Sequence, residues 1–181
     1  MSTPILIQSR KPVPNRWRIR EAEPSPGLPG EPTALAAGDL VPLALWKAVR
    51  ERLAGPSHDL AARVGVLLSP EDDPYELRTD LHRLGAIAIR FPVFTDGRGY
   101  SAARLLRQQL GYRGLLMAVG DVLRDQLLLL ERCGFDTFWL REDQNVIDAL
   151  AAFDDFSDAY QAAAARVPLF ARRQPRGETR P

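Results

Sequence analysis

The stretch FPVFTDGRGYSAARLLR, which spans residues 91–107, decides how this chain folds. An apolar run ends at Phe94, a short turn with two glycines follows, and apolar residues then recur at helical spacing. Glycine tolerates the backbone angles of a tight turn, so the stretch is typical of a strand, a turn and the start of a helix. It represents one βα unit, with a place at its turn where an anion could bind.

The same pattern occurs four times along the chain. Short apolar runs begin at residues 64, 86, 115 and 137, at intervals of 22, 29 and 22 residues, and each precedes a turn and an amphipathic stretch. Strands that alternate with helices at this spacing favour parallel pairing, because parallel neighbours need a long crossover connection. The sequence therefore predicts an α/β fold of repeated βα units with a mainly parallel sheet, either half-barrel-like or open and layered. The expected strands are 64–69, 86–92, 115–119 and 136–140.

Apolar stripes predict the helices between these strands. Ahead of them, Asp39 is expected to cap a helix in which Leu43, Trp46 and Val49 share one face. Three glycines stand where helices are expected to end and to require positive φ, namely Gly85, Gly111 and Gly134.

The chain divides into three parts by composition. Residues 1–35 form an N-terminal arm and a linker rich in proline and glycine, and within the arm 5–7 and 15–20 are expected to form a small hairpin. Residues 36–165 are expected to fold as a single α/β domain. Residues 166–181 contain five arginines and one glutamate, and we expect a basic, disordered tail.

The composition excludes several classes of protein. The 181 residues are 45% hydrophobic and 26% charged with a net charge of +1, so the total charge indicates no nucleic acid partner. No apolar run approaches the roughly 18 residues of a membrane span, and we expect a cytoplasmic protein without membrane association. Cys133 is the only cysteine, and neither His58 nor His82 has metal-ligand neighbours. We therefore expect no metal and no cofactor.

Charged residues follow the predicted strands. Because the carboxyl ends of parallel strands lie at one edge of a sheet, these residues are expected to converge where ligands usually bind. Asp96 and Asp121 are candidate catalytic acids or bases if burial raises the pKa of one carboxyl group. Alternatively, Asp121 and Asp143 cap helices. Further candidates at this edge are Arg124 and Glu142.

The turn of the opening stretch is a candidate anion site. Gly99 lets the backbone expose amides, and Ser101 is expected to cap the helix that follows. Positive charge near the start of this helix is expected from Arg98, Arg104 and Arg107. In the alternative interpretation, Asp96 and Arg98 form a pair that stabilises the turn, and one of the other two arginines faces solvent. The turn matches only the first half of a GxGxxG motif, so it is a weak indication of a nucleotide.

Three segments resemble a known bacterial family. FPVFTDGRGYSAARLLR, GYRG and AVGDVLRDQLLLLERCGFDTF, within residues 85–140, are similar to proteins classed as domain of unknown function 934, which are often labelled probable oxidoreductases of sulfite reduction. The resemblance implies a role in sulfur assimilation, with a sulfite reductase subunit or an anionic small molecule as partner. It extends to the motif residues Asp96, Arg98, Tyr100, Ser101, Arg104, Asp121, Asp125 and Gln126.

The chain departs from the family pattern at two places. Val93 stands where the pattern has a lysine, and Leu115, Leu116 and Met117 stand where it has Glu-Leu-Arg. Charged positions have become apolar, which implies a divergent member with altered activity if those charges serve the site.

Two functions are favoured by the sequence, and a third, a nicotinamide- or flavin-dependent oxidoreductase with an unusual site, is open as well. The first is an accessory or anion-binding protein of assimilatory sulfite reduction without a redox centre of its own, because reducing sulfite requires haem, iron–sulfur or flavin chemistry, for which this sequence carries no motif. The second is a small α/β enzyme, an oxidoreductase or lyase-like, that acts on an anionic metabolite. A homodimer is a further expectation, because a half-barrel leaves sheet edges that need covering.

Overall fold

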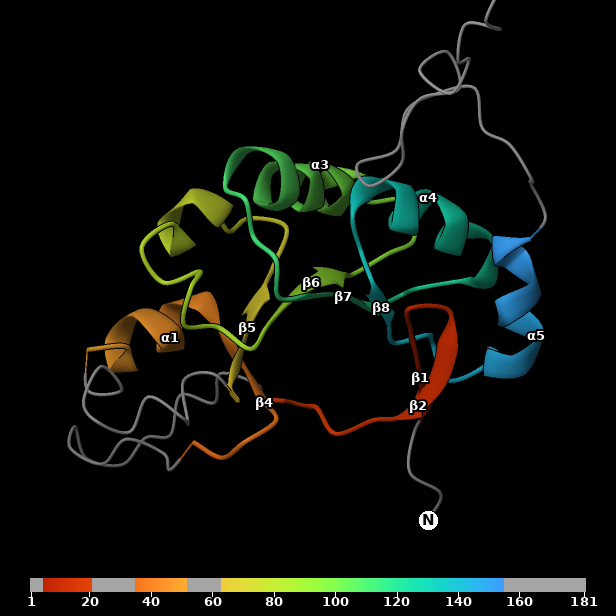
Figure 1. Cartoon of the computed structure of the whole chain (residues 1–181), viewed down its shortest axis with the longest axis horizontal. Helices are drawn as coiled ribbons and strands as arrows, with labels where there is room; N and C mark the ends of the chain where they lie inside the picture. Colours follow the sequence, from red (N-terminus) through yellow and green to blue (C-terminus); the bar gives the residue numbers. More distant parts are fainter. Residues whose placement is uncertain (1–4, 21–34, 52–62, 155–181) are drawn as a thin grey trace, which may run out of the picture.

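The computed structural model describes residues 5–20, 35–51 and 63–154 (Figure 1). Eight strands of these residues form one sheet in the order β2-β1-β8-β7-β6-β5-β4-β3. The strands are β1 (Ile5–Gln8), β2 (Lys11–Pro14), β3 (Arg18–Ile19), β4 (Asp39–Pro42), β5 (Gly65–Leu68), β6 (Ala86–Phe91), β7 (Leu115–Gly120) and β8 (Thr137–Phe138). The α-helices are α1 (Leu43–Val49), α3 (Arg98–Arg104), α4 (Leu127–Cys133) and α5 (Val146–Leu150). Shorter helical turns are η2 (Pro74–Leu77), the π-helical η3 (Leu105–Gln109), η4 (Arg124–Gln126) and η5 (Ala151–Phe153).

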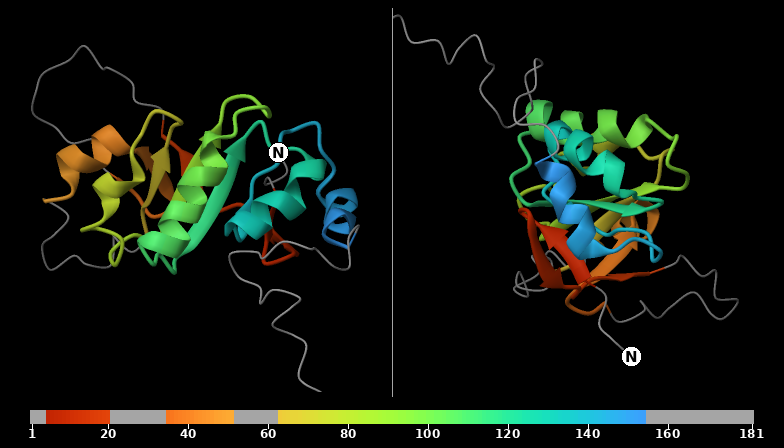
Figure 2. Two further views of the ribbon diagram at one scale, coloured as in Figure 1. Left: turned by 90° about the horizontal axis from the view of Figure 1, so that it is seen from above. Right: turned by 90° about the vertical axis from the view of Figure 1, so that its right-hand side faces the viewer.

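The pairing confirms the expected α/β fold with a mainly parallel sheet. The consecutive strands from β3 to β8 pair in parallel with one another. Strand β1 pairs antiparallel with both β2 and β8. The four strands predicted from the βα pattern are β5, β6, β7 and β8, and they are adjacent in the sheet. The sheet curves into a half-barrel, with α1, α3 and α4 along its convex side (Figures 1 and 2).

Alternation along each strand separates two hydrophobic clusters, because successive side chains point to opposite faces of a sheet. In β6, Ile87 and Ile89 pack against the helices, in the same cluster as Trp46 of α1 and Leu106 of η3. The residues that alternate with them, Ala86 and Ala88, point to the other side and belong to the second cluster, which lies on the concave side of the sheet. The other buried members of this second cluster are Leu6, Leu40, Leu67, Met117 and Val119.

The two edges of the half-barrel approach each other. Strands β2 and β3 end the strand order, yet only Asn15–Trp17 separate them in sequence. Three connecting residues limit the separation of the Pro14 and Arg18 Cα atoms to about 14 Å. We call Asn15–Trp17 the bridge. The expected hairpin is therefore wrong in its second strand, because β1 pairs with Lys11–Pro14 whereas the later alternating residues form β3 beside β4.

Asp39 does not cap a helix, contrary to the expectation. It begins β4, and its fully buried carboxylate accepts hydrogen bonds from the Ala36 amide at 2.9 Å and from Arg18 Nη2 at 2.9 Å. Arg20 Nε lies 3.3 Å from the same carboxylate. The helix begins later, at Leu43. Tertiary ion pairs, which local sequence does not reveal, thus give this aspartate a role inside the sheet.

Positive φ is confirmed at two of the three expected glycines. Gly111 and Gly134 have φ of 69° and 113°, and Gly134 ends α4. Gly85 is not among the glycines with positive φ, because a short η2 and a series of turns precede it in place of a full helix.

Several other expectations concern single residues or chain segments. Cys133 is buried, as a small apolar residue would be, and His82 is exposed. No helix of the described residues is long and apolar enough to cross a membrane. The linker residues rich in proline and glycine (24–32), His58 and the predicted tail over 166–181 lie outside the described residues.

Candidate functional site

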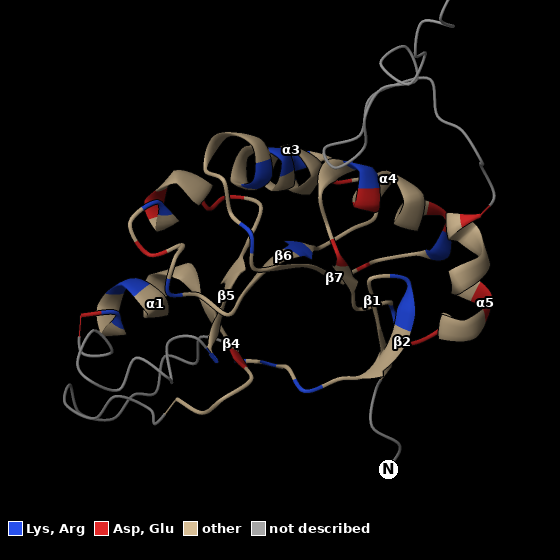
Figure 3. Cartoon of the chain, in the orientation of Figure 1, with Lys and Arg blue, Asp and Glu red and all other residues tan. Residues whose placement is uncertain are grey.

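The loops that follow β5, β6, β7 and β8 meet at the carboxyl edge of the half-barrel, as the parallel pairing requires. Positive and negative side chains are interspersed around the sheet and are not separated onto two faces (Figure 3). The arrangement at the edge therefore depends on which individual groups pair.

Asp96 and Arg98 form a closed pair in the loop after β6. Arg98 donates from Nε and Nη2 to the two carboxylate oxygens of Asp96 at 3.0 and 2.7 Å, and its backbone amide donates to the same carboxylate at 3.1 Å. Arg98 Nη1 also donates to Glu71, in the loop after β5, at 3.3 Å. The hydrogen bonds from Arg98 lower the pKa of Asp96, and the paired carboxylate raises the pKa of Arg98. The geometry corresponds to the turn-stabilising alternative.

Gly99 brings α3 close to β6. A Cβ atom at this position would lie 2.6 Å from Cζ of Phe91 and 3.2 Å from Ile89 Cγ2, so only glycine permits this contact between helix and strand. The helix begins at Arg98 and its N-cap is Gly97, so Ser101 does not cap it. Ser101 and Arg104 are both exposed.

Arg107 does not lie near the start of α3, contrary to the expectation. It is in η3 and donates to the carbonyl oxygens of Tyr112, Gly114 and Gly134 at 2.8 to 2.9 Å. Its Nη2 also donates to Asp136 at 2.7 Å. These acceptors precede β7 and β8, so Arg107 holds the opposite, amino end of the sheet.

Gln126 connects the loop after β6 to the segment after β7. Its side-chain amide donates to the carbonyl oxygen of Phe94 at 3.0 Å and to the Tyr100 hydroxyl at 3.2 Å, while its Oε1 accepts from the Leu123 amide at 2.9 Å. Burial raises the pKa of Tyr100, whose ring packs edge-on against Phe91 at 5.3 Å. The buried Gln126 therefore fixes two loops relative to each other.

Asp121 is placed at the centre of the edge. Its Oδ2 accepts from the Phe94 amide at 2.8 Å, and its Oδ1 accepts from Arg141 Nη1 at 2.7 Å. The other edge of the Arg141 guanidinium donates from Nε and Nη2 to Asp143, both at 2.7 Å. These bonds raise the pKa of Arg141 and lower the pKa of Asp143 to about 2. The capping alternative is wrong for both aspartates, because the N-cap positions of η4 and α5 are occupied by Leu123 and Asn145.

A cavity of about 470 Å³ opens at this edge, and we call it the carboxyl mouth. Its lining includes Ile19, Arg90, Pro92, Gly120, Asp121 and Arg141. Arg90 follows Ala86 and Ala88 on the concave side of β6, so its side chain enters the mouth from the inside of the half-barrel. Gly120, with φ of 100°, forms part of the wall, and a Cβ atom there would lie 2.4 Å from the Phe91 carbonyl oxygen.

The remaining candidates lie around the mouth and do not line it. Asp125 and Glu142 are exposed, and Arg124 contacts Gln144 and Asp148 through its amide and Nε. Within the part of the chain that the structure describes, no group of three His, Cys, Asp or Glu could hold a metal ion.

Sequence reasoning missed Arg90, and it placed Arg141 among the charged residues after the fourth predicted strand without giving it a role. A signal for Arg90 exists in β6, where period-two alternation places an arginine on the face of two alanines. The signal for Arg141 is its position directly after a predicted strand, but its role depends on partners 20 and 2 residues away.

The fold and the site define a small α/β half-barrel protein with a charged mouth at the carboxyl ends of its parallel strands. The chain belongs to the family described as bacterial protein of unknown function (DUF934), whose model matches residues 65–170, more than half of the chain. No curated protein and no solved structure matches it significantly. The family expected from the motifs is confirmed, and the link to sulfite reduction stays a prediction.

The positions expected from the sequence to depart from the family pattern occupy two different places in the structure. Leu115 and Met117 lie on the concave side, Met117 fully buried and Leu115 packed against the same cluster. Val93 is 52% exposed in the loop after β6, next to the exposed Phe94. These positions therefore lie on the inside of the half-barrel and on the surface beside its carboxyl mouth.

Proposed function

We propose that this protein binds a small oxyanion at the carboxyl mouth and acts as an accessory protein without a redox centre of its own. The observation that carries the proposal is that Arg90 and Arg141 line one cavity of about 470 Å³ together with a single carboxylate, Asp121. Of the three charged side chains in this lining, two are guanidinium groups, and Asp143, which also pairs with Arg141, lies outside the lining. Guanidinium groups suit such a site because they bind planar pairs of oxygens with two parallel hydrogen bonds.

Arg141 is held in place before any ligand arrives. Asp121 and Asp143 accept from three of its N–H groups. A guanidinium carries five N–H donors, so these bonds leave two for a ligand. An arginine fixed in this way loses little side-chain entropy on binding, which favours affinity.

Sulfite is the oxyanion that we propose as the natural ligand, with a sulfite reductase subunit as the partner. Support for this finer assignment comes from the resemblance between the motif residues 91–140 and the family pattern. Sulfate and phosphate offer similar oxygen geometry and serve as comparison ligands. The proposal also includes the absence of a coloured cofactor, which the absorbance spectrum of the purified protein tests.

Calorimetric titration with sulfite tests the proposal. We expect saturable binding to the natural chain. In Arg90→Met and Arg141→Met, the affinity for sulfite should fall by about tenfold or more, as the loss of a charged hydrogen bond implies. Arg104→Met is the matched control, because Arg104 is exposed on α3 and does not line the mouth. Equal affinity in all four proteins would contradict the proposal. Loss of binding in Arg98→Met alone would move the site to the turn after β6.

A second candidate function is an enzyme that acts on an anionic metabolite. The observation that favours it is the position of Asp121, whose carboxylate lies in the same cavity as both arginines. The two functions differ in what Asp121→Asn does. If the protein is an enzyme, the natural chain converts its ligand, and Asp121→Asn binds the ligand without converting it. If it is a binding protein, neither the natural chain nor the variant converts the ligand.

A further inference from the structure

A second and larger cavity opens at the opposite end of the half-barrel. Its volume is about 660 Å³, and residues at the starts of the parallel strands, among them Gly38, Gly85 and Leu115, form part of its wall. We call this cavity the amino mouth. It shares no lining residue with the carboxyl mouth.

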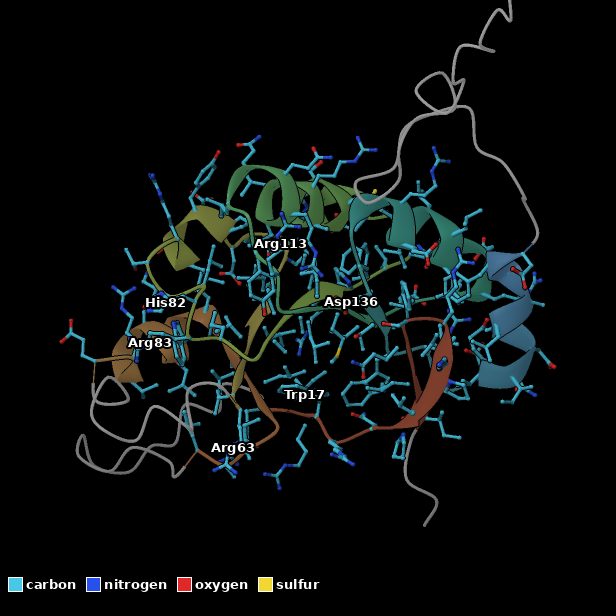
Figure 4. The ribbon with its side chains drawn as sticks, in the orientation of Figure 1. Trp17, Arg63, His82, Arg83, Arg113 and Asp136 are labelled. Carbon is cyan, nitrogen blue, oxygen red and sulfur yellow. The ribbon has the colours of Figure 1, made fainter. Side chains whose placement is uncertain are left out.

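The bridge forms the other wall of the amino mouth. Trp17 projects from the bridge toward the sheet (Figure 4) and packs against the concave cluster. Gly38 has φ of 86°, and a Cβ atom there would lie 2.3 Å from the Arg16 carbonyl oxygen, so the bridge lies directly against the start of β4. Next to this contact, the Arg18 amide at the start of β3 donates to the Gly38 carbonyl oxygen, and the Gly38 amide donates to the Arg63 carbonyl oxygen, both at 2.8 Å.

The lining of the amino mouth has an apolar interior and a basic rim. Leu6, Val13, Trp17 and Leu115 supply apolar surface. The charged residues of the lining are arginines, Arg16 and Arg63, and none of the described residues that line the cavity is acidic. Both arginines are exposed.

Small residues explain why there is room for a ligand here. Ala86 continues the concave side of β6 at this end of the sheet, and Gly85 and Gly38 line the cavity without side chains. Larger residues at these positions would fill the space that the bridge encloses. A cavity of this volume lies within the range that holds drug-sized ligands.

We propose that the amino mouth binds an amphipathic anion, with an aromatic or aliphatic body and one carboxylate or sulfonate group. The body occupies the apolar interior against Trp17 and Leu115, and the anionic group pairs with Arg16 and Arg63 at the rim. A small inorganic oxyanion does not suit this cavity, because it would leave the apolar wall unfilled. The site is separate from the carboxyl mouth and does not depend on the proposed function.

The test uses the fluorescent probe 1-anilinonaphthalene-8-sulfonate and the full-length protein. The chain has three tryptophans, so its indole N–H groups give three resolvable NMR signals. We expect saturable binding with a large shift of the Trp17 signal. Trp46 is the internal control, because its indole is fully buried and donates to Asp80 at 2.9 Å on the convex side. Equal shifts of Trp17 and Trp46, or the absence of saturation, would overturn the proposal.

Variants of the two rim arginines and of Ala37 make the test more specific. Arg16→Met and Arg63→Met are each expected to weaken probe binding about tenfold, and Ala37→Phe is expected to block entry, since Ala37 is an exposed residue of the lining. Arg113→Met is the matched control, because Arg113 is exposed and lines neither mouth. The proposal would be overturned if Arg16→Met, Arg63→Met and Ala37→Phe all bind the probe with the affinity of the natural chain.

Competition separates this proposal from the proposed function. Millimolar sulfite is expected to leave the bound probe in place, because the two ligands occupy opposite ends of the half-barrel. Displacement of the probe by sulfite, or loss of probe binding in Arg90→Met, would place the probe at the carboxyl mouth and overturn the proposal for the amino mouth.

Discussion

The two ends of the half-barrel are held together by different groups. At the carboxyl end, side chains connect the loops, with Gln126 bonded to Phe94 and Asp121 bonded to Arg141. At the amino mouth, backbone hydrogen bonds join Arg18 of β3 to Gly38, just before β4, and Gly38 to Arg63, just before β5. The side chains that order the carboxyl loops also place charge in the carboxyl mouth, whereas the charged residues of the amino mouth lie at its rim and its interior is apolar. The comparison explains why one mouth suits an oxyanion and the other suits an amphipathic molecule.

Arg107 is the exception at the amino end, and its replacement is expected to have the largest effect on stability. Arg107→Met removes the hydrogen bonds to three carbonyl oxygens and the ion pair with Asp136, so we expect the free energy of unfolding to fall by about 3 kcal/mol. Urea denaturation measures this loss. Arg104→Met, on the same helical stretch but exposed, should change stability by less than about 0.5 kcal/mol. Similar losses in both variants would show that Arg107 does not hold the strand starts.

Removal of the connection between the two carboxyl loops is expected to have the next largest effect. Gln126→Leu keeps the side-chain volume but leaves the Phe94 carbonyl and the Leu123 amide unpaired, which should lower stability by about 2 kcal/mol. The oxyanion affinity of the carboxyl mouth should fall as well, because the Phe94 loop also positions Asp121. Thermal unfolding and sulfite titration measure both effects. Asp125→Asn, at the exposed neighbouring position, is the control and should leave both unchanged.

Two glycines of the carboxyl loops provide a smaller and sharper comparison. Gly120→Ala introduces a Cβ atom 2.4 Å from the Phe91 carbonyl oxygen at φ of 100°, which should lower stability by about 1–2 kcal/mol. Gly97→Ala meets no atom within 4 Å and has φ of −78°, so it should be tolerated. Thermal unfolding of the two variants measures the difference. If Gly120→Ala is as stable as the natural chain, the backbone around Phe91 and residue 120 must move to accommodate the added Cβ atom.

The smallest expected effect is the opposite pH dependence of two aspartates, one at each end. The pKa of Asp143 is lowered to about 2, so its contribution to stability is present above the ordinary value of 3.8 and is lost as pH falls through 2. Burial raises the pKa of Asp136. Its contribution is therefore full below 3.8 and declines as pH rises through the folded pKa. Carboxyl NMR titration should show Asp143 ionising at lower pH than Asp136, and the reverse order would contradict the assigned contacts.

Strands β5 to β8 could be predicted from the sequence, because each is an apolar run followed by a turn and an amphipathic stretch. The position of β4 could not, because Asp39 resembles a helix cap until its partners Arg18 and Arg20 are known. The partners of β1 and β3 depend on sheet closure across the bridge, which has no local signal.

The candidate site was predictable only in part. The Asp96–Arg98 pair lies within one turn, so the sequence already contained it as an alternative. Gln126 and Asp121 belong to a recognisable motif, but their bonds to the Phe94 loop cross 32 and 27 residues. Arg90 was hidden within an apolar run and becomes a site residue because β6 turns that side chain toward the concave face.

Oxyanion binding at the carboxyl mouth is the central claim, and the side-chain Nε–H signals of its two arginines test it most directly. In NMR spectra recorded during a sulfite titration, both Arg90 and Arg141 should shift along a single saturating curve with the same Kd, while Arg104 stays in place. The claim would be contradicted if Arg98 or Arg104 shifts with sulfite and Arg90 and Arg141 do not.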